Sequence, residues 1–125
     1  LATVWEFLMK RFNSLKKNRD FQEIYRKGKS YANRYLVMYV MDTGRHDTRI
    51  GISVSKKIGN SVVRHRFVRL VRECFRLNQD ILEDGKDIIV VARAAARDKK
   101  FDEMEGAFLH LCGLHNILGN RSERV

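Results

Sequence analysis

The residues best suited to chemistry in this 125-residue chain are basic side chains crowded into the segment 61–76. At about 100° per residue this segment has the spacing of an amphipathic helix, with its apolar residues on one side. The opposite side and its two edges carry Arg64, His65, Arg66, Arg69, Arg72 and Arg76. Only Glu73 offsets them, although like charges four residues apart on a helix repel each other. An arginine side chain donates two parallel hydrogen bonds to a phosphate, so the pattern favours nucleic acid over a basic surface helix without a partner.

No catalytic arrangement accompanies these basic residues. We find no nucleophile–base pair and no two groups placed for general acid–base catalysis. The acidic residues of segment 80–87 could be metal ligands of a nuclease, but that turn-rich segment lies outside the basic stretch. His110, Cys112 and His115 could indicate zinc, yet a structural zinc site needs four ligands and the chain has no second cluster. We therefore expect no catalytic residue, no metal site and no cofactor bound by the protein.

The elements that must position the basic residues predict an α+β fold of order α-β-β-α-β-α. A turn with the sequence SKKIGN leads into the basic helix and ends at Asn60, a good helix-capping residue. The segment 29–34 has no clear period and is expected to be a connector. The expected elements are a helix at 19–27 capped by Asn18, strands at 35–42 and 49–54, the basic helix at 61–76, a strand at 87–92 and a helix at 101–118.

The connections between these elements predict how the strands pair. A short turn at 43–47 predicts that the strands on either side of it form a hairpin. The strand, helix and strand between residues 49 and 92 predict a parallel pair joined by a crossover helix. We therefore expect a two-layer sandwich, with a small mixed sheet and helices on one side of it.

Composition limits the class of protein. The net charge of +10 points to an anionic partner, and it is concentrated in residues 10–76, which hold 18 Lys and Arg against five Asp and Glu. The length allows one domain, expected at 9–118, with an N-terminal extension or cloning remnant at 1–8 and a flexible tail at 119–125. The two cysteines fall on apolar helix faces and are expected to be reduced. No apolar run is long enough to cross a membrane, and we expect a cytoplasmic protein that is monomeric when free.

The central motif resembles a known signature. The stretch from Ser55 to Arg76 is similar to that of the bacterial ribonuclease P protein subunit, with His65 where that family usually has asparagine. The segments 15–40 and 87–96 also resemble the family, and the likeness extends over about residues 10–118.

The resemblance implies a function for a chain that lacks catalytic residues. In that family the RNA subunit removes the 5′ leader of precursor tRNA by endonucleolytic cleavage, using magnesium, while the protein binds the RNA subunit and the leader. It also implies a left-handed crossover through the basic helix, against the usual right-handed rule. The residues that fall in the family's RNA-binding motif are Lys56, Lys57, Asn60, Arg64, His65, Arg66, Arg69 and Arg72. Those that fall at its leader-binding aromatic positions are Phe21, Tyr25 and Tyr39.

Two other functions remain open at this stage. A structural RNA-binding protein, similar to a ribosomal protein, would share the basic helix but would not distinguish a tRNA that carries its leader. A stand-alone nuclease would cleave RNA without an RNA subunit, and the missing acid–base cluster argues against it.

Overall fold

A computed structural model describes residues 14–119 of the chain. The segment 1–8 and all but the first residue of the tail 119–125 lie outside the described residues, so the expectations for them stay predictions. None of the helices in the described part is both long and apolar enough to cross a membrane.

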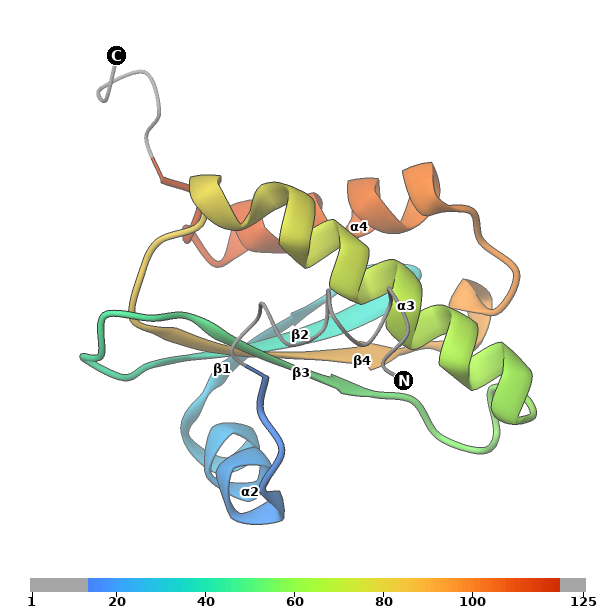
Figure 1. The fold of residues 1–125 in the computed structure, drawn as a ribbon, viewed down its shortest axis with the longest axis horizontal. Helices are drawn as coiled ribbons and strands as arrows, with labels where there is room; N and C mark the ends of the chain where they lie inside the picture. The colour runs from blue at the N-terminus through green and yellow to red at the C-terminus, as the bar shows by residue number, and fades with distance from the viewer. Residues whose placement is uncertain (1–13, 120–125) are drawn as a thin grey trace, which may run out of the picture.

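The core of the fold is a four-stranded mixed sheet with the strand order β1-β2-β4-β3 (Figure 1). Strand β1 is antiparallel to β2, β2 is antiparallel to β4, and β4 is parallel to β3. The predicted α+β class, the mixed sheet and the parallel pair are therefore confirmed. The strands are β1 (Lys29–Ala32), β2 (Leu36–Asp42), β3 (Arg49–Ser53) and β4 (Lys86–Ala92).

The predicted hairpin between β2 and β3 is wrong, because β4 lies between these two strands. In β4 the four consecutive residues 87–90 are buried, whereas β3 has only two buried residues. A strand that is buried on both faces belongs in the centre of a sheet. The connector expected at 29–34 is also corrected, since most of it forms the edge strand β1, whose polar sequence KSYA lacks the alternation that predicts a strand.

Within residues 14–119 three α-helices accompany the sheet: α2 (Asn18–Lys27), α3 (Ser61–Asn78) and α4 (Phe101–Leu114). Helix α2 begins one residue earlier than expected, because Lys17 and not Asn18 occupies the N-cap position. Helix α4 ends four residues earlier than expected. The chain reverses there through Asn116, at a φ of 57°, and the Ile117 amide donates to the carbonyl of Cys112.

The helices lie on both faces of the sheet, which corrects the expectation that they cover one side. Helices α3 and α4 lie over one face and α2 crosses the other (Figure 1). The core is accordingly divided into a large cluster beneath α3 and α4 and a small one around Leu15, Ile24 and Ile89 beneath α2. Helix α2 can pack on the other face because the residues of β2 and β4 that point there are also apolar, apart from Asp87.

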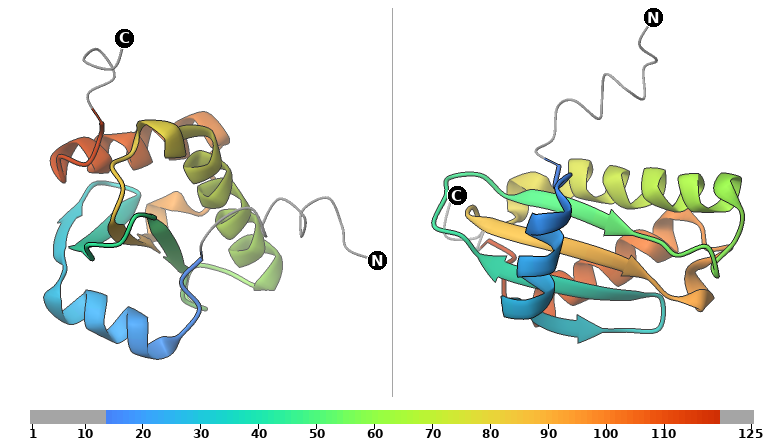
Figure 2. Two further views of the ribbon diagram at one scale, coloured as in Figure 1. Left: turned by 60° about the vertical axis from the view of Figure 1, so that its left-hand side comes forward. Right: turned by 90° about the horizontal axis from the view of Figure 1, so that it is seen from below.

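The crossover from β3 through α3 to β4 is left-handed. Viewed from the side of α3 with β3 and β4 pointing upward, β4 lies to the left of β3, as the two orientations in Figure 1 and Figure 2 show together. The handedness that the family resemblance implied is therefore confirmed.

The buried side of α3 matches its apolar pattern. Phe67, Val71, Cys74 and Phe75 are all at most 3% exposed, so the basic side must face outward. Cys74 and Cys112 are free thiols, and burial raises the pKa of each to about 12. Both thiols are therefore unreactive parts of the core.

Candidate nucleic-acid interface

The turn that leads into α3 is built to present two lysines. Ile58 is buried and anchors the turn, while Lys56 and Lys57 stay exposed beside it. Asn60 caps the helix by accepting a hydrogen bond from the Val63 amide, at 3.0 Å, on its side-chain oxygen. The predicted capping role of Asn60 is thus confirmed, and its side-chain NH₂ group points to no partner among residues 14–119.

The basic face of α3 has an exposed part and a partly buried part. His65, Arg66 and Arg69 are exposed. Arg64 and Arg72 are partly buried, and their Nε atoms are shielded from solvent without a hydrogen-bond partner in the described part of the chain. Burial lowers the pKa of the Arg72 guanidinium.

The last arginine of the helix has a different role. The Arg76 Nε donates to Glu73 at 3.0 Å, and a second contact joins the same two side chains. Arg76 is therefore neutralised within the helix, whereas Arg64, Arg66 and Arg72 form no ion pair with the described part of the chain. The sequence places Arg76 on the same side of the helix as the other arginines but not among the residues of the RNA-binding motif, and the structure adds its pairing with Glu73.

The three aromatic residues singled out in the sequence are brought together. The Phe21 and Tyr25 ring centroids lie 6.3 Å apart, and those of Tyr25 and Tyr39 lie 4.9 Å apart in an edge-to-face contact. All three side chains are partly buried, over the small core cluster beneath α2. One part of each ring therefore packs against this cluster, and another part remains exposed to solvent. We call these three residues the aromatic surface.

The basic face and the aromatic surface approach each other at the outer edge of β3. Ser14 forms a β-bridge with Ile50 of that strand, and its hydroxyl accepts a hydrogen bond from Arg72 Nη1 at 2.7 Å. The next residue, Leu15, is buried in the cluster beneath the aromatic surface. Two adjacent residues thus connect the arginines on one side of the sheet edge to the aromatic rings on the other.

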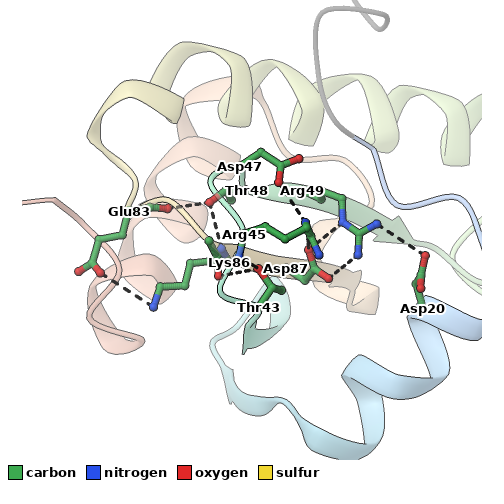
Figure 3. Close-up of polar contacts among 10 residues, drawn as sticks. Asp20, Thr43, Arg45, Asp47, Thr48, Arg49, Glu83, Lys86 and Asp87 are labelled. Carbon is green, nitrogen blue, oxygen red and sulfur yellow. Dashed lines mark hydrogen bonds and ion pairs between the residues drawn. The ribbon is translucent and has the colours of Figure 1, made fainter.

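A cluster of ion pairs near the aromatic surface was not anticipated from the sequence (Figure 3). Asp87 of β4 is 1% exposed. Its Oδ1 accepts hydrogen bonds from Arg45 Nη2 at 2.7 Å and Arg49 Nε at 2.9 Å, and its Oδ2 accepts one from Arg49 Nη2 at 2.6 Å. Burial alone would raise the pKa of Asp87, but the hydrogen bonds and charges of the two arginines outweigh it and hold that pKa below its usual value. A single acid inside an apolar strand, with arginines far away in sequence, gives no local signal for such a cluster.

The residues considered as metal ligands in the sequence have other contacts. Asp87 is held by arginines, and His115 Nε2 lies 2.9 Å from the carbonyl oxygen of Met38. His110 lies beside Asn33, and Cys112 is buried. Within residues 14–119 no three His, Cys, Asp or Glu side chains are grouped so that they could hold a metal ion.

A small α+β domain with one arginine-rich helix face and an adjoining aromatic surface is typical of proteins that bind nucleic acid. The family model described as Ribonuclease P matches residues 9–115. The ribonuclease P protein component of Lachnoclostridium phytofermentans is 51% identical over 107 residues, which are 86% of this chain and 92% of that protein.

Solved structures of the same family share the fold. The Staphylococcus aureus RNase P protein is 39% identical with a TM-score of 0.79, covering 85% of this chain and 97% of that one. The RNase P protein from Thermotoga maritima is 33% identical with a TM-score of 0.75, covering 80% and 94%. The chain therefore belongs to the ribonuclease P protein family. Its role is that of the protein subunit of ribonuclease P, which works with the RNase P RNA in tRNA processing.

Proposed function

We propose that the two surfaces bind different parts of the RNA in this enzyme. The basic face of α3 binds the RNA subunit, and the aromatic surface binds the 5′ leader of precursor tRNA. The observation that carries the proposal is the separation of charged and aromatic side chains onto two surfaces that approach each other at Ser14 and Leu15. An RNA strand that leaves one surface can continue directly onto the other.

The chemistry of α3 suits a folded RNA backbone. His65, Arg66 and Arg69 are exposed on a rigid helix, so their donors are held at fixed spacing toward neighbouring phosphates. Phosphate neutralisation by Arg64 and Arg72 would also offset the cost of keeping their shielded guanidinium groups charged. Lys56, Lys57 and the free amide of Asn60 extend the same surface at the start of the helix.

The aromatic surface suits a single strand. Every base has a π-face, so stacking on Phe21, Tyr25 or Tyr39 tolerates differences in leader sequence. The edge-to-face contact between Tyr25 and Tyr39 holds both rings in place before the leader binds. Little side-chain entropy is then lost on binding.

We place catalysis on the RNA subunit and its magnesium ions. Within residues 14–119 the buried acid Asp87 is occupied by arginines, and both cysteines are unreactive thiols. The acidic residues of this part of the chain are not grouped to hold a divalent ion. The protein therefore assists cleavage by binding and positioning RNA.

We further propose a cytoplasmic protein that is monomeric when free. Among residues 14–119 the well-exposed large apolar side chains are Val62, Leu77 and Leu114. These are few compared with the apolar core of a stable interface, which buries about 1,200–2,000 Å².

The test is precursor tRNA cleavage at low magnesium with the RNA subunit alone, the protein alone, and both together. The proposal expects strong cleavage only when both are present. Cleavage by the protein alone would identify a stand-alone nuclease. If the protein bound RNA without increasing cleavage, it would be a structural RNA-binding protein instead.

A further inference from the structure

A chain of ion pairs runs from the centre of the sheet to helix α2. Arg49 lies directly beside Asp87 in the parallel β3–β4 pairing. Its guanidinium donates hydrogen bonds to both oxygens of the Asp87 carboxylate. The remaining nitrogen of the same guanidinium, Nη1, lies 3.7 Å from Oδ2 of Asp20 on the first turn of α2. Figure 3 shows Arg49 between the two carboxylates. Since Asp87 fixes the position of the guanidinium, Arg49 is a rigid anchor for Asp20.

This anchor acts on the end of α2 that carries the first aromatic ring. Asp20 directly precedes Phe21, and Gly51, two residues after Arg49 on β3, lies beneath the Phe21 ring. The ion pair and the ring contact therefore involve two residues of the same strand, Arg49 and Gly51, which are two positions apart. A tilt of α2 that broke the first contact would also move the second.

Helix α2 has few other restraints. It is 10 residues long, its N-cap Lys17 makes no side-chain capping bond, and Ile24 is its only buried residue. Isolated helices of this length are marginal in water, so contacts with the sheet must set its orientation. Asp20 is the one acidic residue in its first turn, and Figure 3 shows its carboxylate directed at Arg49.

We propose that Asp20 is a positioning residue for leader recognition, acting through its ion pair with Arg49 to hold Phe21 and Tyr25 in their binding orientation. This inference rests on the leader-binding role proposed for the aromatic surface. The side chains of Arg49 and Asp20 are 25% and 21% exposed, so their pair is a modest one. Its loss reduces the fraction of molecules with α2 correctly placed, and the apparent affinity for the leader falls by the same factor.

The direction of the effect distinguishes positioning from simple electrostatics. Replacement of an acid by its amide raises the positive charge near an anionic leader and should by itself strengthen binding. Glu23 provides the matched control, since it lies on the same helix, pairs with Lys27 at 3.7 Å and makes no ion pair with the sheet. Positioning predicts weaker binding for Asp20→Asn only, whereas electrostatics predicts equal or tighter binding for both variants.

The experiment compares Asp20→Asn, Glu23→Gln and Phe21→Ala in enzyme assembled with the RNA subunit, titrated with precursor tRNA and with mature tRNA. We expect Asp20→Asn to bind precursor about two- to fivefold more weakly, with mature tRNA affinity and melting temperature unchanged. Glu23→Gln should bind precursor at least as tightly as the unmodified protein. The double variant Asp20→Asn/Phe21→Ala should lose less affinity than the sum of the two single losses, because Asp20 acts partly through Phe21.

Each other outcome overturns a defined statement. If Asp20→Asn binds precursor as well as Glu23→Gln does while Phe21→Ala is impaired, the positioning role is wrong and the aromatic surface stands. Additive losses in the double variant would also overturn positioning through Phe21. If Phe21→Ala leaves the preference for precursor tRNA unchanged, the proposal that the aromatic surface binds the leader is wrong. The positioning role of Asp20, which rests on that proposal, is then wrong too.

Discussion

The ring of Phe21 lies against the backbone of Gly51, so closely that a side chain at residue 51 would have no room. A Cβ atom on Gly51 would be 2.6 Å from Phe21 Cζ and 3.1 Å from the Cβ of Leu15. The contact brings α2 down onto the sheet at the level of Ile89, the strand partner of Gly51. The position of the Phe21 ring on the sheet therefore depends on residue 51 being glycine, which has no side chain.

This close approach predicts that Gly51→Ala is destabilising. The added methyl group must displace Phe21 or the strand, and such overpacking typically costs about 1–3 kcal/mol. Chemical denaturation measures the free energy of unfolding. Gly106→Ala is the control, because a Cβ on that helical glycine meets nothing within 4 Å. It should stabilise the protein by up to about 1 kcal/mol. A Gly51→Ala protein as stable as the original would show that α2 is not seated as described.

The buried side of α3 predicts a larger loss for Phe67→Ala. Phe67 is 3% exposed, and truncation of a buried phenylalanine costs about 3–5 kcal/mol. This is a large part of a typical folding free energy of about 5–15 kcal/mol. The melting temperature should fall sharply, whereas Val62→Ala on the same helix, at a site 75% exposed, should leave it nearly unchanged. Similar melting curves for both variants would contradict the assignment of the buried face.

Phosphate binding by α3 predicts a change in salt dependence for Arg66→Ala. Affinity for the RNA subunit should fall log-linearly with salt, and the loss of one phosphate contact should reduce that slope by about one. Binding titrations over a range of salt concentrations measure the slope. Arg26→Ala removes an exposed arginine from α2 and should leave the slope for the RNA subunit unchanged. Equal slopes for Arg66→Ala and the original protein would place the RNA surface elsewhere.

Stacking on the aromatic surface predicts a selective defect for Tyr39→Ala. Loss of one base stack is worth about 1–3 kcal/mol, so precursor tRNA should bind roughly ten- to a hundredfold more weakly to the assembled enzyme. Mature tRNA has no leader, and its affinity should hardly change. Tyr31→Ala is the matched control, because Tyr31 packs against His115 and the core cluster of the other face. Equal losses for the two tRNAs would assign Tyr39 to the core alone.

The depressed pKa of Asp87 predicts how stability depends on pH. Its carboxylate is charged in the folded protein to lower pH than in the unfolded chain, so its stabilising effect is present above the unfolded pKa and is lost as pH falls through the folded one. Asp87→Asn should cost about 3 kcal/mol at neutral pH, the lower end for a broken buried pair because both arginines are partly in water.

The two proteins should then converge in acid. The difference in unfolding free energy should be constant above about pH 5 and should shrink below about pH 4, near the ordinary pKa of an aspartate. Denaturation at several pH values measures it. A difference that stayed constant down to pH 2 would mean that folding does not lower the pKa of Asp87.

Local pattern and motif were enough to predict much of this protein. The period of α3 identified both its buried residues and its basic face, because a helix places residues three and four apart on one side whatever surrounds it. Asn60 was recognisable as a cap for the same local reason. The motif around residues 55–76 was specific enough to indicate the family and, through it, the left-handed crossover that no local pattern contains.

Only the tertiary structure decided how these elements combine. Strand β4 separates β2 from β3, and α2 lies on the face opposite α3, because pairing and layering depend on burial shared between distant segments. The Arg49 side chain joins Asp87 to Asp20, and Phe21 lies on Gly51, through contacts between residues that sequence spacing does not relate. Charge and hydropathy patterns record which face of one element is buried, but they carry no information about which other element covers it.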